Sequence, residues 1–394
     1  MNQLKNKITK ALDLQDQSNA GLYIKICLGV LVLLSLLMRI SLIKFQNGDY
    51  VIFSSWYDFV NQHGLGSFKY AFSNYNPPYT YFLYIATLLP VSKIVAIKSL
   101  LALFDIIMAI SVYCVVKAIR PTGWLAWIAG LVTMFAPTVL VTGVFWGQFD
   151  QLYIAFMLFS IYFAIKAKPN SMWTWLSFGL ALSVKFQAIF LLPALVIFSL
   201  RRIRWYDAYW AFVSFFAVTL LPLFAGRSLS SLLNIYPDQA RLFNGWLTLN
   251  APSLYQWFPN SVFPYFNSMA ILLTFAAVLL VVISTIVLKK YKSEDLLLTT
   301  SLLLYLIPFL LPAMHERYFF PANVFSIVLA LAYPRMLYAG VAVASQVIVL
   351  FSYCPFLFGT MPVPMPLLTA GMLIIIFVLW ARHLLPERAV ALSK

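Results

Sequence analysis

The sequence predicts an all-α, polytopic membrane protein with about 12 transmembrane helices. Hydrophobic residues make up 62% of its 394 residues and charged residues only 10%, and the mean hydropathy is +0.87. Soluble globular domains carry about 25% charged residues, so this composition excludes a soluble fold. Many apolar runs reach the roughly 17–25 residues that cross a bilayer. Lysine and arginine lie mainly at the ends of these runs, as membrane orientation requires, so the formal charge of +15 does not indicate nucleic-acid binding.

The N-terminal part of the chain is expected on the inner side of the membrane. The first apolar run, about 22–43, follows a polar leader, residues 1–21, and no small-residue cleavage site ends it. We therefore expect a retained transmembrane helix rather than a signal peptide. The leader is either an amphipathic helix on the inner surface or a disordered tail. Four lysines place it inside: Lys5, Lys7, Lys10 and Lys25.

Residues 44–78 then form an outer loop. This segment is too polar to span the membrane and too aromatic for a free linker, so it predicts short amphipathic helices resting on the outer surface. Its aromatic residues include Trp56, Tyr57, Phe59, Phe68, Tyr70 and Phe72. Residues 79–91 are expected to form a short re-entrant or interfacial helix, and 94–118 crosses inward to Lys117 and Arg120.

The remaining spans follow from the same lysine and arginine bias. The run 172–200 is interrupted at Lys185-Phe186-Gln187 and predicts two short helices that meet outside, because non-helical backbone is tolerated where it lines a cavity. A second outer loop, 226–266, follows the span at 205–225. The other spans are expected at about 122–143, 150–167, 267–289, 295–312, 318–334, 336–353 and 366–382. Residues 1–394 therefore form one integral-membrane domain with both termini inside.

The sequence contains no pattern typical of a metal or nucleotide site. Cys27, Cys114 and Cys354 are scattered in or beside apolar runs and are expected to be small packing residues. There is no DxD, HExxH or Walker motif. We therefore predict no metal, no cofactor and no nucleotide-driven pump.

Short clusters of polar, charged and aromatic residues fall at the ends of apolar runs, on the membrane face assigned as outer. Charged side chains beside hydrocarbon are costly and mark functional sites, so several such patches on one face predict a single active site in the outer membrane face. The patches are Gly48-Asp49-Tyr50, Tyr75-Asn76-Pro77-Pro78, Trp146-Gly147-Gln148-Phe149-Asp150, Lys185-Phe186-Gln187 and His315-Glu316-Arg317-Tyr318.

Two carboxylates compete for the role of a general base. Asp49 lies just beyond the first span, where it can accept a proton from an incoming hydroxyl; the alternative is that it caps the next helix. Asp150 begins a span, and capping the free amides at the start of that helix is sufficient to explain an aspartate at this position. The segment Tyr75-Asn76-Pro77-Pro78 is interpreted as architecture, because each proline fixes φ and keeps its predecessor out of a helix.

Cationic side chains supply the candidate anion site. Lys185 interrupts an apolar run without a nearby Asp or Glu in the sequence, so it pairs with Asp150, binds a ligand phosphate, or extends to the interface. After Pro312, the sequence His315-Glu316-Arg317 combines an arginine suited to bidentate phosphate binding, a histidine suited to proton donation, and a carboxylate. The alternative is a cluster of polar loop residues without a binding role. In the second outer loop, Arg227 and Arg241 are further candidates for an anionic headgroup.

In their order and shared face, these motifs resemble the GT-C glycosyltransferase superfamily. The chain is particularly similar to the polyprenyl-phosphate-sugar-dependent glucosyl- and mannosyltransferases, over roughly residues 22–320. It departs from the pattern of the endoplasmic-reticulum members at Asn76, which separates the tyrosine from the prolines, and at Phe186, which separates Lys185 from Gln187. These departures and the shorter chain favour a bacterial relative with an undecaprenyl carrier.

The resemblance implies an inverting hexosyltransferase in the cell membrane. The donor would be a polyprenyl-phosphate sugar, and the acceptor a lipid-linked or cell-envelope glycan. Asp49, or else Asp150, would be the base, and the donor phosphate would be held by Lys185, Gln187, His315 and Arg317. Residues implied to contact substrate are Tyr50, Trp56, Tyr75, Gln148, Arg241 and Glu316.

The alternative function is a flippase or another transporter of lipid-linked sugars. It would place critical charges near the middle of the membrane or on both faces, and many transporters are built from repeated halves. Neither feature is visible in this sequence.

Overall fold

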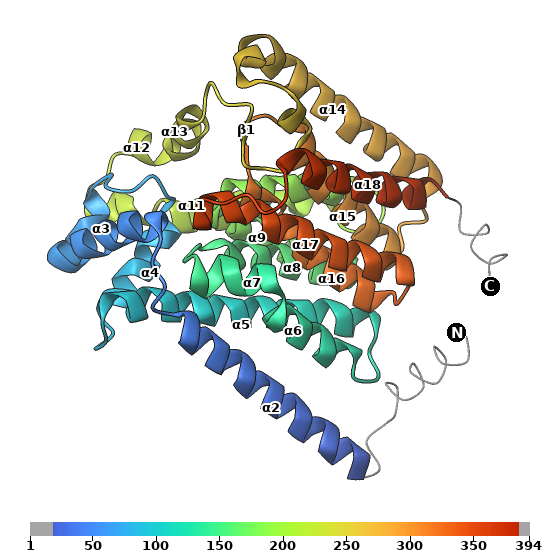
Figure 1. Ribbon diagram of the computed structural model, residues 1–394, viewed down its shortest axis with the longest axis horizontal. Helices are drawn as coiled ribbons and strands as arrows, with labels where there is room; N and C mark the ends of the chain where they lie inside the picture. Colours follow the sequence, from blue (N-terminus) through green and yellow to red (C-terminus); the bar gives the residue numbers. More distant parts are fainter. Residues whose placement is uncertain (1–18, 386–394) are drawn as a thin grey trace.

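The computed structural model describes residues 19–385, so most of the predicted inner leader lies outside the described residues. The regular secondary structure in this part of the chain is helical apart from the two-residue strands β1 (Thr248–Leu249) and β2 (Met314–His315), which pair in parallel. Figure 1 shows the helices gathered around a central bundle, with α2 (Asn19–Leu42) and α14 (Phe263–Leu288) along its outside. The predicted all-α class is confirmed.

Seven helical segments within residues 19–385 are long and apolar enough to cross a membrane, or eight if one bent pair forms a single span. Besides α2 and α14, they are α5 (Lys93–Ile119), α11 (Tyr209–Thr219, with its flanks), α15 (Ser293–Leu310), α17 (Met336–Phe358) and α18 (Met365–Leu384). The chain is therefore an integral membrane protein by length and composition of its helices.

The predicted total of about 12 spans is not confirmed, because several expected spans are short helices. These are α8 (Asp150–Ile165), α9 (Ser171–Val184), α10 (Leu192–Ser199) and α16 (Phe320–Ala332). A helix rises 1.5 Å per residue, so even the 16 residues of α8 cover about 24 Å, less than the roughly 30 Å hydrocarbon core.

The expected span 122–143 is bent by 50° at a break between α6 (Leu125–Phe135) and the segment Pro137–Phe145. Pro137 lacks an amide proton and keeps Ala136 out of the helical region, with φ −59° and ψ 126°. After α7 (Pro137–Leu140), the chain continues as a π-helix over Val141–Phe145. Such π-turns are frequent at functional sites, and this one ends directly before Trp146.

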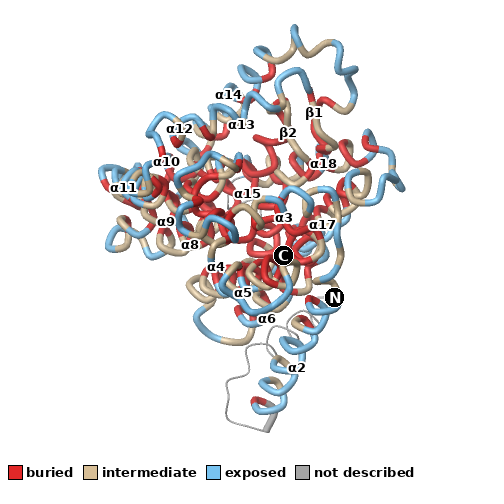
Figure 2. The backbone as a smooth tube through the Cα atoms, turned by 90° about the vertical axis from the view of Figure 1, so that its left-hand side faces the viewer, coloured by how far each residue is buried: buried red, intermediate tan, exposed pale blue. Residues whose placement is uncertain are grey.

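The bundle has a buried centre and a lipid-facing exterior. Helix α15 is 83% buried over its apolar window, whereas α2 is 11% and α14 17% buried. Figure 2 shows this contrast between α15 and α2. Because α2 and α14 expose aliphatic side chains such as Leu33 and Leu272, these faces suit contact with acyl chains rather than water.

The segment after α2 forms short helices, as predicted. Helix α3 (Gly48–His63) is capped by Asn47, whose side chain accepts a hydrogen bond from the Tyr50 amide, and a 3₁₀ turn over Gly64–Lys69 follows. Helix α4 (Pro77–Thr87) begins with its two prolines at the first turn, where the missing amide protons cost nothing. The Tyr-Asn-Pro-Pro segment is therefore a helix start, and α4 is a short helix packed between α3, α5 and α9.

Two further segments bring distant motifs together. The run 172–200 breaks as predicted: α9 ends at Val184, and Lys185 is extended before the 3₁₀ turn Phe186–Leu191 and α10. In the loop 226–266, α12 (Leu229–Leu233) and α13 (Ile235–Leu242) lead to β1, which pairs with β2 through Leu249 and His315. This pairing holds the loop beside the His-Glu-Arg-Tyr motif.

Candidate active site

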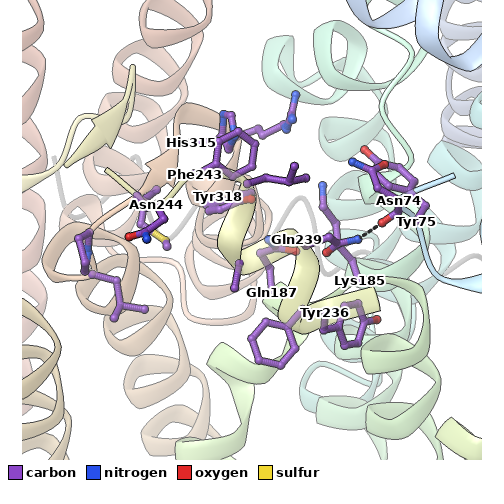
Figure 3. A pocket seen from close by; sticks show the side chains of 18 of the residues that line it. Asn74, Tyr75, Lys185, Gln187, Tyr236, Gln239, Phe243, Asn244, His315 and Tyr318 are labelled. Carbon is purple, nitrogen blue, oxygen red and sulfur yellow. Dashed lines mark hydrogen bonds between the residues drawn. The ribbon is translucent and has the colours of Figure 1, made fainter. Parts of the chain in front are cut away.

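A cavity of about 620 Å³ lies where α3, the break after α9, α13 and the segment 311–318 meet. It receives seven of the side chains that the sequence marked, from segments far apart in the chain: Asp49, Trp56, Tyr75, Lys185, Gln187, His315 and Arg317. Figure 3 shows Lys185 and Gln187 facing the same space as Tyr75, His315 and Tyr318. The predicted motifs therefore converge on one site.

Asp49, the second residue of α3, lies in this cavity with one carboxylate oxygen fully engaged. Its Oδ2 accepts hydrogen bonds from Trp146 Nε1 at 2.8 Å, from Gln148 Nε2, and from Arg317 Nη1 at 3.2 Å. The other oxygen, Oδ1, accepts no hydrogen bond from any residue within 19–385. Because the donors fix the orientation of the carboxylate, Oδ1 is left free for a hydroxyl in the cavity.

The backbone that carries these donors is tied to the start of α3. Asn47 Nδ2 donates to the Trp146 carbonyl at 2.8 Å. The buried Lys98 of α5 donates to the carbonyls of Phe45 and Phe145, the second at 2.8 Å. Lys98 therefore joins the chain just before Asp49 to the chain just before Trp146, and sets their separation.

The sequence offered helix capping as an explanation for Asp150, but Asp150 does not cap α8 in the structure. Phe149 occupies the cap position, and the Asp150 carboxylate, 1% exposed, forms an ion pair with Lys185. Of the partners considered for Lys185, the structure therefore gives it Asp150. The ammonium also lies 5.8 Å from the ring centre of Tyr153 and 5.9 Å from that of Tyr318. Lys185 lines the cavity, whereas Asp150 lies behind it.

Arg317 and His315 also border the cavity. The Arg317 guanidinium lies 5.3 Å from the centre of the Trp146 ring, and its Nε has no partner within residues 19–385. His315 Nδ1 lies 3.8 Å from Glu316 Oε2, and the buried Nε2 of His315 lacks a partner among the described residues. Both residues therefore line the cavity, while one nitrogen of each is buried without a partner within residues 19–385.

Burial and neighbouring charges set the ionisation of these groups. Burial lowers the pKa of His315, so the imidazole is neutral near pH 7 and donates from one nitrogen only. Burial also opposes the charge of Arg317, but Tyr75, Glu316 and Asp49 keep its pKa above the usual value. Burial raises the pKa of Tyr318 to about 12, so its hydroxyl stays a hydrogen-bond donor.

The other predicted site residues lie outside the cavity lining. Gln148 and Glu316 are buried behind it, and Gln148 acts through its bond to Asp49. Tyr50 packs against the core. Arg241 is 78% exposed on α13 and pairs with Asp238 at 3.3 Å, so it does not line the cavity.

Sequence reasoning missed the contribution of α13 and of Asn74. Tyr236, Gln239, Phe243 and Asn244 line the cavity from the second loop. Gln239 donates to the Asn74 carbonyl (Figure 3), and Tyr236 donates to the Leu182 carbonyl. These two hydrogen bonds hold α13 beside the end of α9, where the helix breaks at Lys185. The available signal was the amphipathic run 235–242 between two apolar spans.

The sequence matches no known protein family, and no curated protein is significantly similar to it. Its fold, however, is similar to that of ArnT from Cupriavidus metallidurans, solved bound to undecaprenyl phosphate. The TM-score is 0.54 at 13% sequence identity, over 91% of this chain and 78% of ArnT. The chain has the GT-C fold. The GT-C resemblance inferred from the motifs is thus confirmed at the level of the fold.

Proposed function

We propose that this GT-C protein is a hexosyltransferase that uses a polyprenyl-phosphate-linked donor. It would transfer the sugar, with inversion, to a lipid-linked or cell-envelope glycan on the outer face of the cell membrane. The observation that carries the proposal is the position of Asp49, which lines a cavity of about 620 Å³ together with Lys185 and Arg317.

The donor side of the proposal rests on the cations and the apolar lining. Lys185 and Arg317 place two positive charges at one cavity, and Tyr318 and His315 add neutral donors. Phosphate oxygens are well matched by such a set. The same cavity extends to Phe186 and Ile271, both partly exposed, which suits the first isoprene units of a lipid carrier. ArnT, whose fold is similar, was solved with undecaprenyl phosphate.

The proposed reaction needs one proton acceptor and one stabilised leaving group. The acceptor hydroxyl donates its proton to Asp49 as its oxygen forms a bond to the anomeric carbon. The bond from that carbon to the phosphate oxygen breaks, and the leaving polyprenyl phosphate takes the electron pair. Lys185 and Arg317 stabilise the charge that grows on the phosphate. Attack opposite the leaving group inverts the configuration.

The direct test is transfer of labelled hexose by the purified protein. Undecaprenyl-phosphate glucose and mannose serve as donors, and glycolipids extracted from the envelope of the source cells serve as acceptors. Labelled glycolipid and released undecaprenyl phosphate are expected in equal amounts. If the labelled donor crosses a vesicle membrane without transfer, the flippase alternative holds instead.

Variants of Asp49 and Asp150 distinguish a catalytic carboxylate from a structural one. Asp49→Asn is expected to lower kcat by at least about 10²-fold, the scale of lost general-base help, with little change in donor binding. Asp150→Asn is expected to act through stability, because its carboxylate pairs with Lys185 behind the cavity. Single-turnover transfer at saturating donor decides between them. An inactive Asp150→Asn beside a near-normal Asp49→Asn would reverse the assignment.

A further inference from the structure

Lys98 is a fully buried lysine whose partners are backbone carbonyls rather than a carboxylate. It lies in the second turn of α5, about 7.5 Å from the start of that span at 1.5 Å per residue. Its ammonium donates to the carbonyls of Phe45 and Phe145, and no carboxylate within residues 19–385 forms an ion pair with it. A buried charge without a counter-ion is costly in a membrane protein and indicates a functional role.

The two carbonyls belong to stretches of backbone that lack a helical donor. Phe45 lies between α2 and α3, and Phe145 is the last residue of the π-helix. Neither carbonyl is followed by a helical turn whose amides could donate to it. After Phe145, the chain turns at Gly147, whose φ of 94° favours glycine. An apolar side chain in place of Lys98 would leave both carbonyls without this donor.

Two further contacts join the same pair of segments. The rings of Phe45 and Phe145 stack, with their centres 3.7 Å apart and their planes at 13°. Asn47 Nδ2 donates to the Trp146 carbonyl at 2.8 Å. Lys98, the stacked rings and the Asn47 amide therefore all act on one relationship, the position of the segment before α3 against the end of the π-helix.

These two segments carry the candidate base and most of its hydrogen-bond donors. Asp49 follows Phe45 closely in the chain, and Trp146 and Gln148 directly follow Phe145. The side chains of Trp146 and Gln148 supply two of the three hydrogen bonds that Asp49 Oδ2 accepts within residues 19–385. A shift of one segment against the other would therefore move both donors relative to the carboxylate.

We propose that Lys98 is a positioning residue of the transfer reaction, because it holds Trp146 and Gln148 in place around Asp49. Lys98 itself does not line the cavity, so it acts without touching a substrate. The inference rests on the proposed function of Asp49 as the base. A misplacement of about 1 Å at a reacting group can lower a rate about 10²-fold. Loss of Lys98 should therefore lower kcat, with little effect on the KM for the donor.

The first test compares turnover in three variants. Lys98→Met keeps the length of the side chain and removes its donors, and kcat per folded protein is expected to fall about 10- to 100-fold. The KM for the polyprenyl-phosphate sugar should change less than about twofold. Lys98→Arg keeps donors and should regain part of kcat. Lys93→Met, which removes a cation that pairs with Asp58 at the start of the same helix, should leave kcat unchanged.

The second test reports the position of Trp146 without any turnover. Protein grown with fluorinated tryptophan gives a fluorine resonance for Trp146, which is assigned by its loss in Trp146→Phe. Asp49→Asn is expected to shift this resonance, because it changes the group that accepts from Trp146 Nε1. Lys98→Met is expected to shift it as well, whereas Lys93→Met is not.

An unchanged fluorine resonance together with an unchanged kcat in Lys98→Met would overturn the proposal. So would a loss of thermal stability alone, which would give Lys98 a structural role only. If the wild type transfers no sugar, the proposed function fails, and the fluorine resonance then decides by itself whether Lys98 sets the position of Trp146 against Asp49. Lys98→Gln, with the same expected directions, is used if Lys98→Met does not fold.

Discussion

Arg317 Nη1 lies 3.2 Å from Asp49 Oδ2, although 268 positions separate the two residues in the chain. The contact joins the start of α3 to the segment between α15 and α16. It also places beside the proposed base a guanidinium whose Nε has no hydrogen-bond partner among residues 19–385. One arginine thus orients Asp49 and faces the space proposed for the donor phosphate.

Removal of Arg317 is expected to impair the use of donor. Arg317→Ala should cost about 2–5 kcal/mol in kcat/KM for the polyprenyl-phosphate sugar, because a buried charge pair is broken. Lys93→Ala, which removes one partner of the exposed pair Lys93–Asp58, is the matched control and should cost less than about 1 kcal/mol. Initial-rate kinetics with varied donor measure both. Unchanged donor kinetics for Arg317→Ala would remove it from the site.

The Lys185–Asp150 pair is expected to serve both stability and donor binding. Lys185→Ala should lower the free energy of unfolding by about 3–5 kcal/mol, because the buried Asp150 carboxylate loses its partner, and should weaken donor use as well. The double variant Lys185→Met/Asp150→Asn should regain most of the stability but not the donor affinity. Unfolding in detergent and donor titration measure the two effects. Recovery of both would give Lys185 a structural role only.

Gly143 is expected to tolerate no side chain. A Cβ there would lie 2.7 Å from Asp105 Oδ1 and 2.7 Å from Gln151 Nε2, in the π-helix before Trp146, and Asp105 is held by the buried Arg39 at 2.9 Å. Gly143→Ala should therefore destabilise the fold by about 1–3 kcal/mol and lower activity. Gly340→Ala, where nothing lies within 4 Å of the added Cβ, should be neutral or stabilising. Thermal unfolding compares them.

His315 is expected to make stability fall in mild acid. Burial lowers its pKa below the unfolded value of about 6.5, so the unfolded state binds more protons in this range. The free energy of unfolding therefore decreases as the pH drops through about 6.5. Wild-type protein should lose more stability between about pH 7.5 and 5.5 than His315→Gln. Equal losses would show that His315 does not titrate in this window.

Topology is testable by cysteine labelling in a variant without native cysteines. Exposed positions Gln62 and Trp257 are expected to react with an impermeant reagent from outside. Exposed positions Arg201 and Lys290 are expected to react only after the membrane is opened. If positions 62 and 201 label from the same side, the active-site cavity and the loop after α10 do not lie on opposite faces.

The class of protein and the places where polar residues interrupt the helices can be read from the sequence alone. Apolar run length and charge at the run ends are local properties, so the helices, the break at Lys185 and the helix start at Pro77 are visible without a fold. The number of full spans is not visible in this way, because α8, α9 and α16 end after 16, 14 and 13 residues. Lys166 and Lys185 follow the first two helices, and Tyr333, the residue before Pro334, follows the third. The burial of these helices inside the bundle replaces contact with lipid.

Which charged side chains pair with one another is visible only in the packed bundle. Asp49 pairs with Arg317, Lys185 pairs with Asp150, and α13 lines the cavity without Arg241, which pairs with Asp238. Such pairings depend on how helices far apart in the chain pack against one another. Burial then makes each pairing obligatory, because a charge left alone inside the bundle would cost several kcal/mol.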